Sequence, residues 1–242
     1  MADGNDGDRQ VDESRSDRKR KTIVEAGLQV FLSKGYLGTS VDEIAAAASV
    51  SKQTVYKHFT DKERLFTEII LNTIDQVGEP FYEGIDALPE TDDLERDLGE
   101  LGRRLIRIVM QPQLLRLRRL VIGEAARFPD LGRAYFERGP GRTVETLATR
   151  FGRLAERNLL RTDDPMLAAQ HFLYLVVSIS LYEVMLSGND DRFTPAELER
   201  FADEGLRVFL AAYAEPGPER TRPRASKRSA SPSSPSRRPL RR

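Results

Sequence analysis

Residues 51–58, with the sequence SKQTVYKH, combine basic, amide and aromatic side chains that can contact nucleic acid. Lysine suits the acceptor atoms of guanine and glutamine can pair with adenine, so Lys52 and Gln53 are the predicted base-reading residues. Tyr56, Lys57 and His58 are better suited to phosphates, which fix the register of a complex without reading its sequence. The alternative interpretation is an ordinary amphipathic helix with a solvated, charged face.

The helix expected before this cluster is defined by its cap and by its apolar spacing. Ser40 and Glu43 stand three residues apart and predict a capping box at the first turn. Apolar side chains then recur on one helical face, at Val41, Ile44, Ala45 and Ala48. Ser49-Val50-Ser51 breaks this pattern, so we expect a tight turn there.

The cluster itself is predicted to form a second short helix. Ser51 can cap it, and Val55 and Phe59 stand four residues apart, so both side chains should anchor it to the core. Thr60 and Glu63 predict a further capping box at the start of the next helix. A helix, a tight turn and a second helix form a helix-turn-helix, which places its second helix in the major groove of DNA.

At fixed spacing, residues 18–66 resemble the signature of the tetracycline-repressor (TetR) family. The matching residues are Gly35-Tyr36, Thr39-Ser40-Val41, Ile44-Ala45, Val50-Ser51-Lys52, Val55-Tyr56-Lys57-His58-Phe59 and Lys62-Glu63-Arg64-Leu65. The resemblance implies an all-α, dimeric transcriptional regulator with an N-terminal DNA-binding domain and a C-terminal ligand-binding domain. One departure is Ser49, where the family usually has glycine, and serine in a left-handed conformation carries an energetic cost.

The resemblance also implies roles for individual residues. Lys52 and Gln53 are the expected base readers, and the expected phosphate contacts are Thr39, Tyr56, His58 and Lys62. With the side chains around them, the predicted DNA-binding set is Thr39, Ser40, Ser51, Lys52, Gln53, Thr54, Tyr56, Lys57, His58 and Lys62.

Charge is balanced over the 242-residue chain, with 38 basic and 38 acidic residues, but it is unevenly distributed. Residues 18–60 carry seven bases and three acids, and residues 215–242 carry nine bases and two acids. Residues 1–17 and 61–214 are acidic. Positive charge therefore gathers on the predicted DNA-binding segment and on the C-terminal tail, where it can attract phosphate.

Catalytic and metal sites are not expected. The chain has no cysteine and only two histidines, His58 and His171, so thiolate and histidine-based metal sites are excluded. The motifs of phosphate-binding loops, dinucleotide sites, zinc peptidases and serine hydrolases are absent. His171 is the one candidate general base, and such a lone histidine on an apolar helix is more often a core residue. We therefore expect no enzyme, cofactor or metal, with a helical enzyme or scaffold as the remaining alternative.

Apolar stripes continue beyond the helix-turn-helix and predict an all-α chain. The expected helices are 17–33, 61–77, 91–112, 113–127, 143–156, 164–186 and a last one from Thr194-Pro195. Residues 78–90 are expected to form a loop or an irregular helix, and Gly139-Pro140-Gly141 a turn or kink. The run 120–131 resembles a C-terminal domain of some efflux-regulating members of the family. The predicted organisation is 1–16 disordered, 17–62 helix-turn-helix domain, 63–214 effector-binding and dimerisation domain, and 215–242 disordered basic tail.

A small-molecule effector is expected among the C-terminal helices, where helical folds usually bind ligands. Apolar, aromatic and polar character at inward positions gives the candidate pocket residues Met110, Leu117, Phe128, Phe151, His171, Tyr174 and Ser178. Phe and Leu dominate, so an apolar or amphipathic effector fits best. The resemblance implies a homodimer formed through the last two helices, which reads a palindromic operator and is released by the effector. A DNA-binding regulator without an effector remains an alternative.

The chain is expected to be cytoplasmic, without a membrane partner. Its N-terminus is acidic and polar and has no apolar signal region. The longest apolar stretch, about 172–186, is predicted to be too short to span a bilayer, and it contains Glu183.

Overall fold

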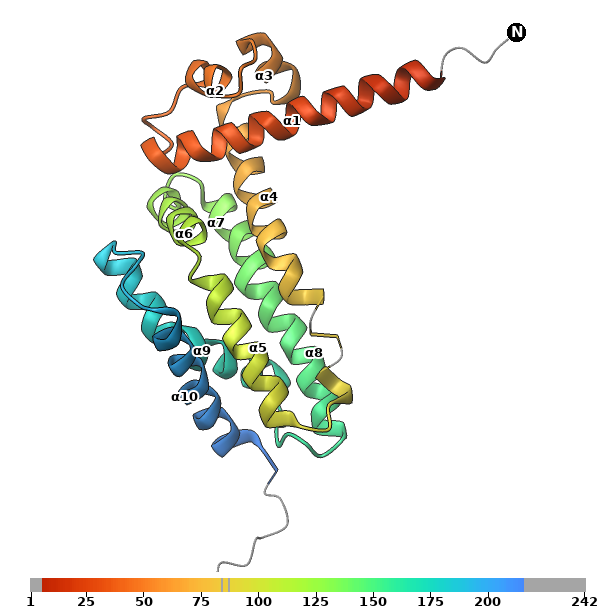
Figure 1. Cartoon of the computed structure of the whole chain (residues 1–242), viewed down its shortest axis with the longest axis vertical. Helices are drawn as coiled ribbons and strands as arrows, with labels where there is room; N and C mark the ends of the chain where they lie inside the picture. Colours follow the sequence, from red (N-terminus) through yellow and green to blue (C-terminus); the bar gives the residue numbers. More distant parts are fainter. Residues whose placement is uncertain (1–5, 84, 87, 216–242) are drawn as a thin grey trace, which may run out of the picture.

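The computed structural model describes residues 6–83, 85–86 and 88–215, and these residues form helices with one isolated β-bridge between Leu160 and Ala214. The predicted all-α class is therefore confirmed. The N-terminal helices α1, α2 and α3 lie together at one end of the molecule, and α4 runs from them toward the C-terminal helices (Figure 1). These elements are α1 Asp6–Lys34, α2 Val41–Ala47, α3 Lys52–His58 and α4 Lys62–Glu83.

The first helix is longer than the sequence pattern predicts. It begins at Asp6 rather than near residue 17, so the expectation of disorder over 1–16 is wrong for residues 6–16. The stretch from Arg9 to Lys21 contains neither glycine nor proline, so nothing in it ends a helix. At its other end, α1 stops at Gly35 as expected, with a left-handed φ of 70°. The predicted basic tail 216–242 lies outside the described residues.

The turn between α2 and α3 is a Schellman motif with serine in the left-handed position. Ser49 has φ 54°, its N–H donates to the carbonyl oxygen of Ala46, and the N–H of Val50 donates to that of Ala45. These two bonds satisfy carbonyl groups at the end of α2. The turn therefore keeps the backbone geometry for which glycine is usually needed, at the energetic cost of a β-carbon.

Two predictions for α4 are wrong. Its N-cap is Asp61, whose carboxylate accepts the N–H of Arg64 at 2.7 Å, rather than Thr60 in a capping box. The expected end at residue 77 is also wrong, because the helix continues through Pro80 to Glu83, so of the loop and the irregular helix expected from residue 78 the helical alternative holds as far as Glu83. Phe81 is 2% exposed in the C-terminal core, so burial of this side chain offsets the backbone bond that proline removes.

The C-terminal half is a bundle in which α9 and α10 lie side by side along one flank (Figure 1). The predicted single helix over 113–127 ends at Glu124, and a separate short helix follows that the sequence pattern did not reveal. Gly139-Pro140-Gly141 lies in a π-helical turn that leads into α8. The elements are η1 Leu88–Glu90, α5 Leu94–Val109, α6 Pro112–Glu124, α7 Pro129–Phe136, η2 Glu137–Gly141, α8 Arg142–Glu156, α9 Pro165–Ser187 and α10 Pro195–Tyr213.

Two hydrophobic cores hold these helices. The N-terminal core joins α1–α3 and the first half of α4 to α6 and α7, through Leu117, Val121 and Leu131. The C-terminal core fills the space between α5, α8, α9 and α10, around Phe151, Phe172 and Phe209. Because α4, α5 and α6 take part at the boundary between the two cores, a shift of the bundle can reach the helix-turn-helix through packed side chains.

Helix α9 is 23 residues long and its most apolar 18-residue window has a mean hydropathy of 1.4, so it is long and apolar enough to cross a membrane by length and composition. The prediction that this stretch is too short is therefore wrong. Only 39% of its most apolar window is buried within the chain, and Ile179, Tyr182 and Leu186 are exposed. An apolar face of this size needs a partner, and a second protein helix serves this purpose as well as lipid does.

Candidate nucleic-acid interface and ligand cavity

Helix α3 presents its polar side chains outward, as the spacing predicts. Val55 and Phe59 are each 1% exposed and fix the helix to the N-terminal core, and the Ser51 hydroxyl accepts the N–H of Thr54 at 3.1 Å. The outer face then carries Lys52, Gln53, Tyr56 and Lys57, all of them exposed. This arrangement leaves a basic and aromatic helix face open to a nucleic-acid groove.

Lys52 is not entirely free on that face. Its Nζ lies 3.0 Å from a carboxylate oxygen of Asp42 on α2, and this hydrogen bond and ion pair raise the pKa of the lysine. Both side chains are exposed, so the pair contributes little to stability. A base or phosphate acceptor that binds Lys52 must compete with Asp42.

Two predicted phosphate contacts, Thr39 and Lys62, form hydrogen bonds within the domain instead. Thr39 is 3% exposed, and its hydroxyl donates to the carbonyl oxygen of Gly35 at 2.7 Å. The Nζ of Lys62 donates to the backbone oxygen of Thr39 at 2.6 Å and lies 4.3 Å from the centre of the Tyr36 ring. In this arrangement Thr39 and Lys62 position the start of α2 rather than reach outward. The family spacing marks these positions but cannot show which way the side chains point.

The other predicted contacts fall into two groups. Ser40 accepts the N–H of Glu43, and the Glu43 carboxylate accepts the N–H of Ser40, so the predicted capping box is confirmed. Ser51 is occupied by its own cap, and its hydroxyl also lies 2.8 Å from that of Thr54. Ser40, Ser51 and Thr54 therefore stabilise the starts of α2 and α3, and the accessible donors lie on the outer face of α3.

His58 is partly buried at the end of α3, beside the ring of Phe59. Burial lowers its pKa from the ordinary value of 6.5, and the nearby positive charges of Lys57, Arg20 and Lys19 lower it further. The imidazole is therefore mostly neutral at pH 7 in the free protein. A phosphate beside it would favour the charged form instead.

The basic residues at 18–21 have different surroundings. Arg20 bonds to Glu68 of α4, and its guanidinium lies 5.4 Å from the centre of the Phe59 ring. Lys19 and Lys21 are exposed, and the Nζ of Lys21 lies 4.0 Å from a carboxylate oxygen of Glu25 on the same helix. Arg20 thus ties α1 to α3 and α4, whereas the two lysines stay at the surface.

A cavity of about 250 Å³ lies between the two cores. Helix α4 supplies Ile74, Val77 and Phe81 to its wall, and α6 supplies Leu114 and Arg118. The remaining wall comes from α5, the end of α7, η2, the start of α8 and α9. Apolar side chains dominate this wall, which is typical of small-molecule sites. Since α4 enters it directly from the helix-turn-helix, a ligand here would contact the element that joins the two domains.

Most of the predicted pocket residues lie elsewhere. Tyr174 lines this cavity. Met110, Leu117 and Phe151 are buried in the two cores, and Phe128 packs 4.7 Å, ring to ring, from Tyr36. His171 and Ser178 line a shallow outer groove between α9 and α10, where Nδ1 of His171 lies 2.6 Å from the Tyr213 hydroxyl. Hydrophobic spacing cannot separate a core position from a cavity wall, because both face inward.

Arg118 is the one charged residue among the described residues that line this cavity, and it was not predicted from the sequence. It stands four residues after Leu114 and three before Val121, on the same face of α6. A cation at this position of an apolar stripe is the signal that could have identified it.

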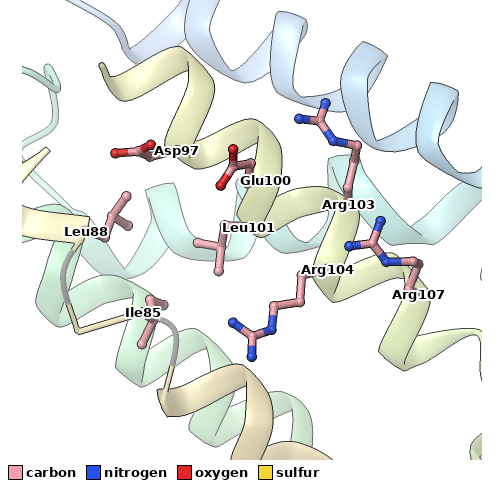
Figure 2. A pocket seen from close by; sticks show the side chains of 8 residues that line it. All are labelled: Ile85, Leu88, Asp97, Glu100, Leu101, Arg103, Arg104 and Arg107. Atoms are coloured by element: carbon pink, nitrogen blue, oxygen red, sulfur yellow. The ribbon is translucent and has the colours of Figure 1, made fainter. Parts of the chain in front are cut away.

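A larger hollow, about 490 Å³, lies between α5 and the side chains of Ile85 and Leu88, and it is lined largely by charged side chains. Figure 2 shows Asp97 and Glu100 at one end of the labelled set and Arg104 and Arg107 at the other. Arg103 and Arg107 pair with Asp203 and Glu199 of α10 at 2.6 and 2.9 Å. These arginines fasten α5 to α10, and the hollow is far more polar than the cavity beside α4. The smaller cavity is therefore the better ligand site.

Comparison with known proteins agrees with this layout. Residues 23–69 match the family described as bacterial regulatory proteins, tetR family, and residues 96–215 match the AefR-like transcriptional repressor C-terminal domain. Among curated proteins, the HTH-type transcriptional repressor DhaR of Mycobacterium sp. (strain GP1) is 45% identical over 51 residues, which is 21% of this chain. That match covers 26% of DhaR, so this relative supports the shared segment rather than a shared activity.

Solved structures match over most of the chain. A TetR-family transcriptional regulator from Mesorhizobium loti MAFF303099 is 46% identical, with a TM-score of 0.78, and the match covers 83% of this chain and 98% of that one. The flavonoid-responsive regulator FrrA is 31% identical, with a TM-score of 0.66, over 81% of this chain and 97% of its own. With a helix-turn-helix that leaves α3 exposed and a helical domain of the matching type behind it, the chain belongs to the TetR family of transcriptional regulators.

Proposed function

We propose that this chain is a cytoplasmic, ligand-responsive repressor that binds a palindromic operator as a homodimer and is released by a small molecule. The observation that carries the proposal is the position of α4, which begins at the helix-turn-helix and then forms one wall of the apolar cavity. A ligand that fills this cavity contacts the connecting helix itself. Coupling between two sites of this kind is typically worth about 1–3 kcal/mol.

The DNA-binding part of the proposal rests on α3. Lys52 and Gln53 lie in its first turn and are exposed, which suits base contacts in the major groove. Tyr56, Lys57 and His58 follow on the outer and flanking positions and suit phosphates. Thr39 and Lys62 are proposed to position α2 and α3 rather than to touch DNA.

The dimeric part rests on the exposed apolar face of α9 and α10. Ile179 is 62%, Tyr182 70% and Leu186 71% exposed on α9, and Val208 is 45% exposed on α10. Exposed apolar patches of this kind mark protein interfaces. A second copy packed on this face would form a four-helix arrangement and set the spacing of two α3 helices on DNA.

The test is binding to DNA upstream of the chain's own gene, with random DNA as competitor at physiological salt. We expect saturable binding that survives the competitor and is reduced by small apolar ligands. Val109→Phe tests the role of the cavity, because it adds volume at the cavity wall on α5 and leaves α3 unchanged. This variant should bind the operator like wild type but lose the response to ligand. Operator binding that no cavity ligand alters, in wild type or variant, would favour a regulator whose C-terminal domain serves dimerisation alone.

A further inference from the structure

The cavity beside α4 has one charged side chain among its described lining residues, Arg118, in a wall made mostly of apolar residues. Arg118 projects from α6 among Leu105, Ile108, Leu114 and Leu173. No described carboxylate lies within 4.0 Å of its guanidinium, whereas its neighbour Arg119 is paired with Asp190 at 2.7 Å. Arg118 is half-buried and its Nη1 atom is buried, so an anionic group bound in the cavity would give this guanidinium a charged partner.

Arg118 and Tyr135 each have a buried polar atom that makes no well-formed hydrogen bond within the described part of the chain. These atoms are Nη1 of Arg118 and the hydroxyl oxygen of Tyr135. The two side chains lie next to each other: the charge of Arg118 and a hydrogen-bonding interaction with it favour the ionised form of Tyr135, against the larger effect of burial, which raises the pKa of the tyrosine. Buried polar groups without partners are uncommon in folded proteins and point to a missing ligand or water.

Of the other polar side chains of the wall, Tyr82 and Thr143 are already bonded, and Tyr174 is 53% exposed. The Tyr82 hydroxyl lies 3.2 Å from that of Thr143, and the Thr143 hydroxyl donates to the carbonyl oxygen of Gly139 at 3.0 Å. A polar ligand therefore finds its open donors at the α6 end of the cavity. The apolar part of the ligand would lie toward Phe81, Val177 and the other hydrophobic side chains.

From this arrangement we propose that the effector is a compact aromatic or alicyclic carboxylate, anchored by Arg118. The inference rests on the proposed function, because it assigns a chemical class to the effector of the same cavity. A planar guanidinium matches the two oxygens of a carboxylate, and such charge-assisted bonds are about twice as strong as neutral ones. The volume of about 250 Å³ lies below the usual range of ligand pockets, which restricts the apolar part to one or two rings.

The test compares naphthalene-2-carboxylate with the neutral naphthalene-2-carboxamide, which has nearly the same shape. Affinities are measured by calorimetry at pH 7 on the full chain as wild type, Arg118→Met and Arg118→Lys. Wild type should bind the carboxylate about tenfold or more tightly than the amide. Arg118→Met should remove this preference while keeping amide binding, which shows that its cavity is intact. Arg118→Lys retains a cation without the planar fork and should keep part of the preference.

Arg116→Met is the matched control. Arg116 lies on the same helix but is exposed, with its guanidinium 3.8 Å from Asp190 and outside the cavity wall. This variant loses the same charge and should keep the wild-type preference. If the preference for the carboxylate over the amide persists in Arg118→Met, or disappears equally in Arg116→Met, Arg118 does not anchor the ligand.

Operator binding measured on the same samples separates this inference from the proposed function. Equal affinities for both probes, with release of the operator by either, would overturn the carboxylate preference and leave the ligand-responsive repressor standing. Failure of wild type to bind either probe, with intact operator binding, would also overturn the inference. Failure to bind the operator specifically would overturn the proposed function itself.

Discussion

The Nζ atom of Lys62 donates to the backbone oxygen of Thr39 at 2.6 Å and lies 4.3 Å from the centre of the Tyr36 ring. This contact joins the first turn of α4 to the residue before the N-cap of α2. Since α4 also forms a wall of the ligand cavity, its displacement would move the start of α2 through this bond. Lys62 is thus placed to couple the helix-turn-helix to the rest of the chain.

We expect Lys62→Met to weaken binding to specific and random DNA without the full change in salt dependence of a lost phosphate contact. Loss of one phosphate contact lowers the salt slope by about 0.9. The exposed Lys57 supplies the comparison, and Lys57→Met should show that full change. Fluorescence anisotropy at several salt concentrations measures both. An equal change of slope in the two variants would mean that Lys62 turns outward to contact DNA.

Removing the carboxylate that holds Lys52 should strengthen DNA binding. Asp42→Asn deletes the ion pair at 3.0 Å and leaves Lys52 free for an acceptor on DNA, so we expect a several-fold gain in operator affinity. Asp130→Asn makes the same change of charge on α7, away from the predicted DNA-binding face, and should have a smaller effect. Operator titrations of both variants at one salt concentration compare the two gains in affinity. Equal gains would assign the effect to net charge alone.

The base-reading and phosphate-binding roles on α3 can be separated by competition. Gln53→Ala should lose about 1–3 kcal/mol on the operator and much less on random DNA, because the amide is assigned to a base edge. Tyr56→Phe removes a hydroxyl assigned to phosphate and should weaken both DNAs alike. Parallel binding curves with both DNAs test the division. If the two variants lose the same ratio of specific to random affinity, the assignment of Gln53 to a base is wrong.

DNA binding should tighten as the pH falls through the range in which His58 titrates. The pKa of His58 in the free protein is lowered by burial and by nearby cations, whereas DNA phosphates favour the charged form. Complex formation therefore takes up a proton, and affinity rises from about pH 7.5 to about pH 6.

Without DNA the sign is opposite: the unfolded chain protonates first as the pH falls through 6.5, so stability falls. His58→Gln should flatten the His58 contribution to both profiles, measured by anisotropy and by chemical denaturation. A pH-dependent affinity that is unchanged in this variant would place the proton uptake on another group.

Ser49→Gly should stabilise the helix-turn-helix. Ser49 has φ 54° and an exposed side chain, so its β-carbon adds strain that glycine lacks. Glycine loses more conformational entropy on folding, so we expect a net gain of roughly 0.5–1 kcal/mol. Urea denaturation provides the measurement. Ser49→Ala is the control, because it removes the hydroxyl but keeps the β-carbon, and it should give no such gain.

The sequence was most informative where a side chain bonds to the backbone within three or four residues. The caps formed by Ser40, Ser51 and Thr194, and the glycine stop at Gly35, depend on local bonds that spacing reveals directly. The helix-turn-helix follows from the first two of these caps and from the inward pair Val55 and Phe59.

Long-range packing explains what the sequence did not reveal. Pro80 remains in α4 because Phe81 is buried against helices distant in sequence, and Lys62 points inward because its Nζ bonds to the backbone oxygen of Thr39, which lies just before α2. The cavity was missed for a related reason. Inward spacing gives the same pattern for Phe151, which fills a core, and for Leu114, which lines an empty volume.

Helix α10 packs tightly against the backbone of α9 at Gly205. A β-carbon built there would lie 2.5 Å from the carbonyl oxygen of Leu175, which is backbone and cannot move aside cheaply. We expect Gly205→Ala to destabilise the chain by about 1–3 kcal/mol despite the better helix propensity of alanine. Gly123→Ala on α6 meets no atom within 4 Å and should stabilise by about 0.5–1 kcal/mol. Denaturation of the two variants beside wild type measures the difference. Because α9 and α10 also carry the proposed dimer face, Gly205→Ala should additionally weaken self-association in sedimentation experiments. A Gly205→Ala protein as stable and as dimeric as wild type would show that the two helices can separate at no cost.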